Sequence, residues 1–429
     1  MDPVRELVAA RPDFFANRAA WRGEAARIGD FIHMSNGLSN AYMLTAGASR
    51  VIINTGMGFE APTHKRVFDA VHRGPTPYIL LTQGHVDHVG GVRLFREPAT
   101  QLVAQRNNQA CQADDARIRG VRNRQAYIWF KAAFDASTKA AVERPAVAAQ
   151  DVPVPDITFE DSHRLSVGGL DLELYAVPGG ETIDSCVIWL PQHKILFSGN
   201  LFGPLFPHFP NFNTIRGDKY RFVEPYLESL RRVRALEPET LVTGHFDPIE
   251  GRELIRVCLD RLEAAVQFVH RETLGRINAG QEIWRAMREV ELPPELYVGQ
   301  GYGKVSWAVR TIWESYMGWF KADHTSELYA TRPRDIYPDL VALAGAAAVV
   351  ERGRQRLERR DAEGAMLLAE AALAHDALDP GALALACDAS KALLDRSGGG
   401  NFWETGWLEH QIAELERRLA QRKAAGGSA

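Results

Sequence analysis

Leu81-Thr-Gln-Gly-His-Val-Asp-His-Val-Gly-Gly91 is the most informative stretch of this chain. It places His85, Asp87 and His88 within four residues, directly after the apolar run 77–81, which predicts a β-strand. The glycines on both sides of the histidines argue against a helix and predict a glycine-rich loop. Such a loop lets two imidazoles and a carboxylate converge on metal ions, and these donors suit zinc, but also iron or manganese. A solvated polar loop is the alternative for so short a motif, and the strand before it favours metal binding.

The same stretch resembles the signature of the metallo-β-lactamase superfamily, Thr-His-x-His-x-Asp-His-x-Gly-Gly. The sequence departs from that signature once, at Gln83, where the family has its first histidine. The family's earlier Asp-Thr-Gly strand end resembles Asn54-Thr55-Gly56, and its last ligand histidine resembles Gly244-His245. The resemblance implies an α/β fold, the αββα sandwich of this superfamily, with a metal-bound hydroxide as nucleophile.

Within the superfamily, three features resemble the alkylsulfatase branch. Val177-Pro-Gly-Gly-Glu181 is similar to that branch's Pro-Gly-Thr-Glu, whose glutamate replaces the usual third histidine ligand. Asn211-Phe-Asn-Thr-Ile-Arg-Gly217 is similar to its Asn-Leu-Tyr-Thr-Leu-Arg-Gly, whose arginine binds sulfate. The aromatic segment 307–320, together with 401–406, resembles its helical dimerisation region. The resemblance covers roughly residues 30–415, and the chain is expected to end before the lipid-carrier-like domain of the larger alkylsulfatases.

The resemblance also implies two metal positions. Carried over residue by residue, the ligands are Gln83, His85 and Glu181 for the first ion, Asp87, His88 and His245 for the second, and Asn200 where relatives have a bridging carboxylate. Two neighbouring cations repel each other, so a neutral amide at the bridging position, and another in place of an imidazole, weaken the first site most. The second set keeps one carboxylate and two imidazoles and leaves an open position for water, as catalytic zinc requires.

Several of these residues have an alternative interpretation from local sequence alone. Glu181 is a surface carboxylate without its Pro-Gly-Gly context, and Asn200 follows a glycine, as turn residues often do. His245 follows a predicted strand, which favours a ligand over a satisfied buried histidine. Arg216 is either a loop arginine in a salt bridge or an anion clamp, since a guanidinium matches sulfate, phosphate or carboxylate oxygens in a bidentate fork. For His208, a structural loop histidine and a pocket residue are equally good interpretations.

Hydrophobic periodicity predicts a mixed first part and a helical second part. Short strands are expected at 41–45, 50–54, 77–81, 170–175, 185–190, 194–197 and 241–243, with the fifth and sixth forming a hairpin, and helices around 222–236 and 254–273. Beyond that, 307–320 is interpreted as core or dimer contact. The segment 349–394 is interpreted as a helical hairpin with a break at Asp379-Pro380-Gly381, and it resembles a tetratricopeptide unit without a clean repeat. The segment 404–423 is interpreted as a charged amphipathic helix. We therefore expect a catalytic domain over 1–275, an all-helical dimerisation domain over 276–423 and a disordered tail over 424–429.

Composition excludes several classes of protein. The 429 residues carry a net charge of -4 and 46% hydrophobic residues, a globular composition that calls for neither nucleic acid nor an anionic membrane. The four cysteines are scattered singly, which argues against a disulfide framework and against a thiolate zinc site. The first residues lack a basic-then-apolar signal pattern, and no apolar run of about 20 residues follows. A cytoplasmic protein is therefore expected.

These features predict a metal-dependent hydrolase in which metal-bound hydroxide attacks an ester-like, anionic small molecule. Asp87 would hold the metal and orient the hydroxide, Arg216 would bind the anionic group, and zinc, as one or two ions, would be the cofactor. A homodimer through the helical region is expected. Three alternatives stay open: hydrolysis of a carboxylic ester, thioester, lactone or lactam on the same fold, a di-iron redox enzyme, and a degenerate dimeric binding protein, which Gln83 and Asn200 keep open.

Overall fold

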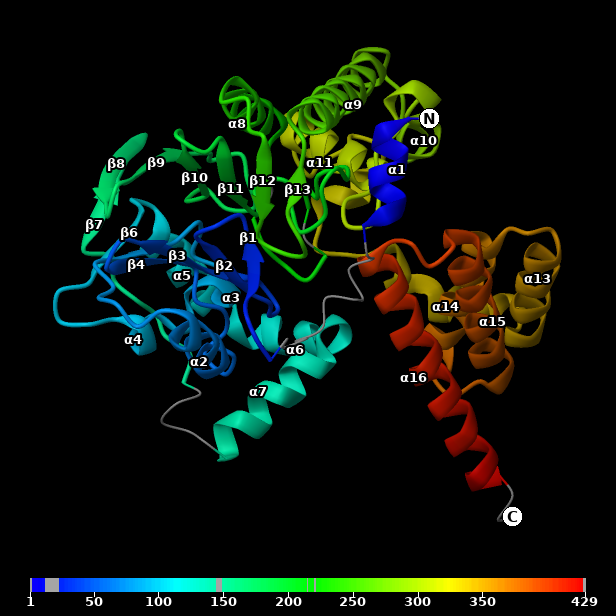
Figure 1. The fold of residues 1–429 in the computed structure, drawn as a ribbon. Helices are drawn as coiled ribbons and strands as arrows, with labels where there is room; N and C mark the ends of the chain where they lie inside the picture. Colours follow the sequence, from blue (N-terminus) through cyan, green and yellow to red (C-terminus); the bar gives the residue numbers. More distant parts are fainter. Residues whose placement is uncertain (1, 12–22, 144–148, 214, 220, 427–429) are drawn as a thin grey trace. The chain divides into compact units, whose positions relative to one another are not determined.

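The computed structural model describes residues 2–11, 23–143, 149–213, 215–219 and 221–426. The chain forms two compact units, Met1–Ser315 and Tyr316–Ala429, which are described separately (Figure 1). Among the described helices, none combines the length and the apolar character that crossing a bilayer requires.

Two β-sheets form the centre of the first unit (Figure 1). The first sheet has the strand order β1 (Ala26–Ile28), β2 (Ile32–Ser35), β3 (Ala41–Ala46), β4 (Ser49–Ile53), β5 (Tyr78–Leu80), β6 (Gln101–Gln105) and β7 (Ile157–Phe159). The second has the order β13 (Ile249–Glu250), β12 (Thr240–Thr243), β11 (Ile195–Gly199), β10 (Cys186–Leu190), β9 (Leu170–Ala176) and β8 (Ser162–Val167). The strands predicted from sequence are confirmed, and β10 pairs antiparallel with β11 as the expected hairpin.

Side chains that alternate along the strands fill the space between the sheets. In β9, Leu170, Leu172 and Leu174 are buried, while Asp171 between them is exposed. This alternation follows from the two-residue period of a strand. The leucines join one apolar cluster with residues of the first sheet such as Tyr42. One shared core therefore holds the two sheets together.

Helices cover the two outer faces of the sandwich. They are α2 (Ala61–Val71) and α4 (Val92–Phe95) on the first sheet, and α8 (Val223–Ala235) and α9 (Arg252–Asn278) on the second. Phe68 and Phe95 pack beside Ile52 on the first sheet, and Leu230 packs with Leu196 on the second. The predicted αββα sandwich is confirmed, and α8 and α9 lie where the periodicity predicts helices.

Parallel strand pairs bring four loops to one edge of the sandwich. β4 runs parallel to β5 in the first sheet, and β11 runs parallel to β12 in the second. Because parallel neighbours end at the same edge of their sheet, the residues that follow them meet there. Asn54 donates a hydrogen bond through Nδ2 to Thr82 Oγ1 (2.9 Å), and Asn40 N donates to Gly244 O (2.8 Å). Asn200, after β11, lies beside Gly244 at this edge.

The connection from β6 to β7 contains three further helices, which the sequence analysis did not predict. They are α5 (Asn108–Arg117), α6 (Arg119–Trp129) and α7 (Lys131–Glu143). α6 has no buried residue, and Ala140 is the buried residue of α7. These two helices therefore contribute little to the core and lie beside the sandwich (Figure 1).

The first unit extends past the domain boundary predicted at 275/276. α10 (Ile283–Glu289) and α11 (Val305–Met317) bury Ile283, Val309 and Trp313 in the same cluster as Leu259 of α9. Residues 307–313 are therefore mainly core, which confirms that interpretation of the aromatic segment. Packing divides the chain after Ser315. The boundary at 275/276 separates a catalytic from a dimerisation domain, and it stays a prediction.

The second unit is helical. It contains α12 (Tyr337–Ala344), α13 (Ala346–Glu358), α14 (Ala362–His375), α15 (Pro380–Ser397) and α16 (Phe402–Gly426), preceded by short 3₁₀ turns at Thr325–Leu328 and Pro333–Ile336. Its core is built of small residues, so that the helices approach closely. The single hairpin predicted over 349–394 is wrong in one respect, because a second break at Asp361 makes three helices. The side chain of Asp361 caps α14 by accepting a hydrogen bond from Gly364 N (2.8 Å). Such a capping residue is a local signal that does not change the hydrophobic periodicity.

The amphipathic helix predicted at 404–423 is confirmed by α16. This helix runs to Gly426, so the tail predicted to be disordered overlaps its last turn. Residues 427–429 lie outside the described residues.

Gly353 generates a prediction about packing in the second unit. A Cβ at Gly353 of α13 would lie 2.2 Å from Cδ2 of Leu385, a buried side chain of α15. Gly353→Ala is therefore expected to destabilise the protein by about 1–3 kcal/mol, because overpacking outweighs the better helix propensity of alanine. Gly275 of α9 is the matched control, since no heavy atom lies within 4 Å of its Cβ position and Gly275→Ala should stabilise by about 0.5–1 kcal/mol. Urea unfolding measures both, and a stabilised Gly353→Ala variant would contradict this packing.

Candidate metal centre

The histidine motif forms a one-turn helix, α3 (Val86–Val89), with His85 as its N-cap. The glycine-rich loop predicted for this stretch is therefore wrong, because the glycines flank the turn and do not interrupt it. Gly84 and Gly91 are needed for close packing. A Cβ at Gly84 would lie 2.9 Å from Asn108 O, and one at Gly91 would lie 2.2 Å from Ala61 Cβ.

Asp87, His88 and His245 come together at the edge where the parallel strands end. One ligand-capable atom from each lies within 4.8 Å of the other two. His88 and His245 are buried, their ring planes stand at 88°, and Asp87 Oδ2 lies 3.7 Å from His88 Nε2. In the part of the chain that the structure describes, no other trio of histidine, cysteine or acidic residues is as compact.

Hydrogen bonds from neighbouring loops hold the backbone of this trio. Ser39 Oγ donates to Asp87 O, Thr55 N donates to His88 O (2.8 Å), and Thr243 Oγ1 donates to His245 O (2.5 Å). These bonds fix the backbone of the three residues, so that their side chains face one another.

The imidazoles of His88 and His245 are neutral, which is the protonation state that binds a metal. Burial lowers the pKa of His88 to about 4 and also lowers the pKa of His245, so that both rings are neutral at pH 7. Neither ring nitrogen of His88 has a hydrogen-bond partner, although the residue is fully buried. Buried polar atoms are normally paired, and two neutral imidazoles with one carboxylate are a common zinc donor set. The residues present therefore fit a divalent cation.

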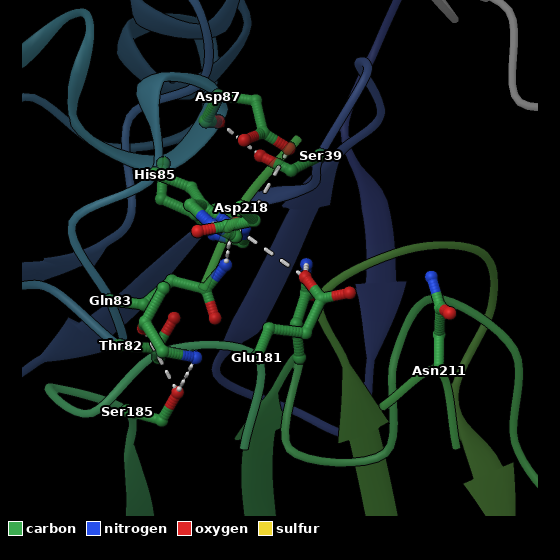
Figure 2. A network of polar contacts seen from close by, with 12 residues as sticks. Ser39, Thr82, Gln83, His85, Asp87, Glu181, Ser185, Asn211 and Asp218 are labelled. Atoms are coloured by element: carbon green, nitrogen blue, oxygen red, sulfur yellow. Dashed lines mark hydrogen bonds and ion pairs between the residues drawn. The ribbon is translucent and has the colours of Figure 1, made fainter. Parts of the chain in front are cut away.

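His85 lies in a second polar group beside the trio. Its Nδ1 is 2.8 Å from Gln83 Nε2 and 3.6 Å from Glu181 Oε2, and its Nε2 is 3.6 Å from Asp218 Oδ2 (Figure 2). Burial by itself lowers the pKa of His85. The carboxylates of Asp218 and Glu181 have the opposite and larger effect, and the pKa is raised to about 9. The predicted first set, Gln83, His85 and Glu181, is thus assembled, with the Gln83 amide on the ring nitrogen that faces Glu181.

Glu181 and Asn200 join the two groups. Asn200 Nδ2 donates to Glu181 Oε2 (2.9 Å) and lies 3.2 Å from His245 Nε2. Arg221 forms an ion pair with Glu181 (3.5 Å). Burial opposes the charge of Glu181, but Arg221, His85 and Asn200 together hold the pKa of this carboxyl well below its usual range. Asn200 Oδ1 is buried without a partner, and a Cβ at Gly244 would lie 2.1 Å from it.

A cavity of about 520 Å³ opens onto these groups. Its lining includes His85, Asp87, Glu181, Asn200, Arg216 and His245, the apolar residues Phe59, Val86, Val89, Ala126, Phe130, Ala133, Phe134 and Val152, and further polar residues such as Arg119, Arg122 and Ser137. The apolar part of the lining comes in part from α6 and α7, together with Phe130 between them. A polar molecule with an apolar extension matches this lining.

Arg216 faces the cavity, as the anion-clamp interpretation requires. Its Nε has no hydrogen-bond partner. Burial would lower the pKa of Arg216, but Tyr302 and the carboxylates of Asp218, Glu181 and Asp87 raise it, so the guanidinium stays charged. The cavity therefore offers a cation to an anionic group.

Some residues at the site were missed by the sequence analysis. Asp218 and Arg221 lie just beyond the Asn211–Gly217 motif, and their proximity to Arg216 in sequence was an available signal. Arg122 also lines the cavity, where it pairs with Asp115 (2.7 Å), but its helix carries no motif.

His208 lies away from the cavity. It is buried, its Nδ1 accepts from Gly301 N (2.9 Å), and it packs against Gly299. The structural interpretation of this residue is therefore the better one.

Two protein families match this chain. Residues 34–245 match the metallo-beta-lactamase superfamily, and residues 280–402 match the alkyl sulfatase dimerisation family. A linear primary-alkylsulfatase from a Pseudomonas strain is 27% identical over 321 residues, which are 71% of this chain and 60% of that protein. An (R)-specific secondary-alkylsulfatase from Pseudomonas sp. is 26% identical over 286 residues, which are 63% of this chain and 42% of that protein.

A solved structure shows the same fold. A stereoselective inverting sec-alkylsulfatase from Pseudomonas sp. superposes with a TM-score of 0.78 at 21% identity, over 92% of this chain and 65% of that one. The matched part of the chain spans at most about 60% of the length of these two curated relatives.

Proposed function

We propose that this chain, which joins a metallo-beta-lactamase superfamily domain to an alkyl sulfatase dimerisation domain, is a metal-dependent hydrolase of anionic esters. The convergence of Asp87, His88 and His245 beside the cavity carries this proposal. One carboxylate and two neutral imidazoles bind a divalent cation and leave positions open for water and substrate. Zinc suits these donors, and iron or manganese are the other candidates.

The cation supplies a Lewis acid that polarises the substrate and makes water acidic enough to attack at neutral pH. The protein residues position the reactants. Asp87 presents a carboxylate to the cavity, where it accepts a proton from the attacking water and orients it. Arg216 binds the anionic group of the substrate in the same cavity. The apolar part of the lining keeps bulk water away, which strengthens the charge interactions inside.

The lining of the cavity and the names of the relatives point to the same substrate class. A sulfate monoester places its anionic sulfate at Arg216 and its apolar alcohol along Phe130 and Phe134. We therefore propose a sulfuric ester of an apolar alcohol. The other hydrolyses on this fold would use Arg216 only if the substrate carried a separate anionic group, such as a carboxylate.

The proposed metal sites generate a prediction about stoichiometry. Gln83 and Asn200 are neutral, so the Asp87–His88–His245 site should fill first. Zinc titration of the apoprotein by calorimetry should show one tight and one weaker event. His88→Ala should remove the tight event, whereas the exposed control His375→Ala should leave both unchanged. Two equally tight ions would contradict the unequal sites, and the absence of zinc binding would favour a degenerate binding protein.

Substitution of Arg216 tests the proposal that the substrate carries an anionic group. Arg216→Lys keeps the charge but loses the planar fork, so kcat/KM for sulfate esters should fall by an amount equivalent to about 1.5–3 kcal/mol. Metal content should not change, because Arg216 is not a proposed ligand. Arg285→Lys, at an exposed ion pair with Glu289, is the matched control and should have no effect. If turnover of every active substrate stays within twofold, the anion clamp is wrong.

Homodimer formation is a further part of the proposal. The helical second unit exposes several large apolar side chains, among them Tyr316 (55%), Trp319 (66%), Leu340 (52%) and Leu343 (86%). Exposed apolar surface of this kind is typical of interfaces, and the dimerisation family covers residues 280–402. Sedimentation velocity at micromolar concentration should show a dimer, and a monomer would contradict this assembly.

A further inference from the structure

The imidazole of His85 lies between two carboxylates. Glu181 Oε2 is 3.6 Å from Nδ1, and Asp218 Oδ2 is 3.6 Å from Nε2 (Figure 2). Only the Nδ1 side carries other proposed metal ligands, because Gln83 also faces this nitrogen. The two ring nitrogens therefore have different surroundings, and the Nε2 side has no role yet.

The atoms on the Nε2 side lack hydrogen-bond partners. His85 Nε2 and Asp218 Oδ2 are both buried atoms without one, and their separation of 3.6 Å is slightly too long for a hydrogen bond. The side chain of His85 is 9% exposed and that of Asp218 is 18% exposed. A small movement of the loop would close this gap.

We propose that Asp218 is a positioning residue for His85. Its carboxylate accepts a hydrogen bond from the Nε2–H group of His85 and so keeps Nδ1 directed at Glu181 and the first cation. This proposal rests on the metal sites proposed above. A histidine that binds a metal through one nitrogen commonly donates from the other to a carboxylate, which fixes the tautomer and the ring orientation. Asp218 also places a negative charge beside the site where Asn200 supplies none.

Arg122 does not account for the position of Asp218. Its guanidinium lies 4.0 Å from Asp218 but only 2.7 Å from Asp115, so Asp115 is its main partner. Among the described residues, Asp115 forms an ion pair with Arg122 and none with His85, which makes it a matched carboxylate near the same arginine.

Asp218 also connects the metal site to the substrate site. It lies two residues after Arg216 in the same loop, so contact between Asp218 and His85 holds this loop against the cavity. The positions of Asp218 and Arg216 therefore depend on the same short segment.

The test compares zinc binding by Asp218→Ala, Asp218→Asn and Asp115→Asn in the full chain. In Asp218→Ala, the affinity of the weaker zinc event should fall by about 10–100-fold, while the tight event stays unchanged. Asp218→Asn should lose less affinity, because its amide oxygen still accepts a hydrogen bond from the Nε2–H group. Asp115→Asn should bind both ions as the parent protein does.

Three results would overturn the proposal. The first is an unchanged weaker event in Asp218→Ala, the second is an equal weakening of both events, as a general structural effect predicts, and the third is binding of a single ion by the parent protein. In each case the hydrolase proposal survives, provided that the tight event at Asp87, His88 and His245 remains. Loss of that event in the parent protein would instead remove the proposed function.

Discussion

Parallel pairing of neighbouring strands in both sheets is the constraint on which the site depends. β4 with β5 and β11 with β12 end at one edge of the sandwich, so loops far apart in sequence meet there. The hydrogen bond from Asn40 N to Gly244 O ties the loops of the two sheets together. The position of His245 relative to His88 is therefore set by strand pairing and not by local sequence.

Charge is distributed unevenly over the assembled site. The Asp87–His88–His245 group keeps a carboxylate and two imidazoles that burial holds neutral. The neighbouring group contains two amides, Gln83 and Asn200, which cannot offset the repulsion between two cations. This asymmetry is the physical reason to expect unequal metal sites.

The cavity combines two environments that favour one kind of ligand. Arg216 keeps its charge because carboxylates surround it, although burial opposes that charge. Phe130 and Phe134 add apolar surface beside polar residues such as Arg122, and they belong to a helical segment with few core contacts. The proposed sulfuric ester of an apolar alcohol would place its charge at Arg216 and its apolar part at Phe130 and Phe134.

Local sequence was sufficient for seven of the strands, for helices such as α8, α9 and α16, and for the motif that contains Asp87 and His88, whereas His245 was expected from the family resemblance. Strand alternation and the ligand motif are properties of neighbouring residues, so they are visible without a structure. The one-turn helix at His85 was missed because flanking glycines look the same as glycines inside a loop. The break at Asp361 was missed because a single capping residue leaves hydrophobic periodicity almost unchanged.

Tertiary structure alone decided the partners of these residues. No sequence pattern shows that Asp218 faces His85 or that Asn200 lies between Glu181 and His245, because these contacts join loops from different strands. The same holds for the apolar part of the cavity lining, since α6 and α7 carry no motif. The sequence by itself determined the sandwich and the types of ligand, whereas the packing of loops at one edge determined which atoms face each other.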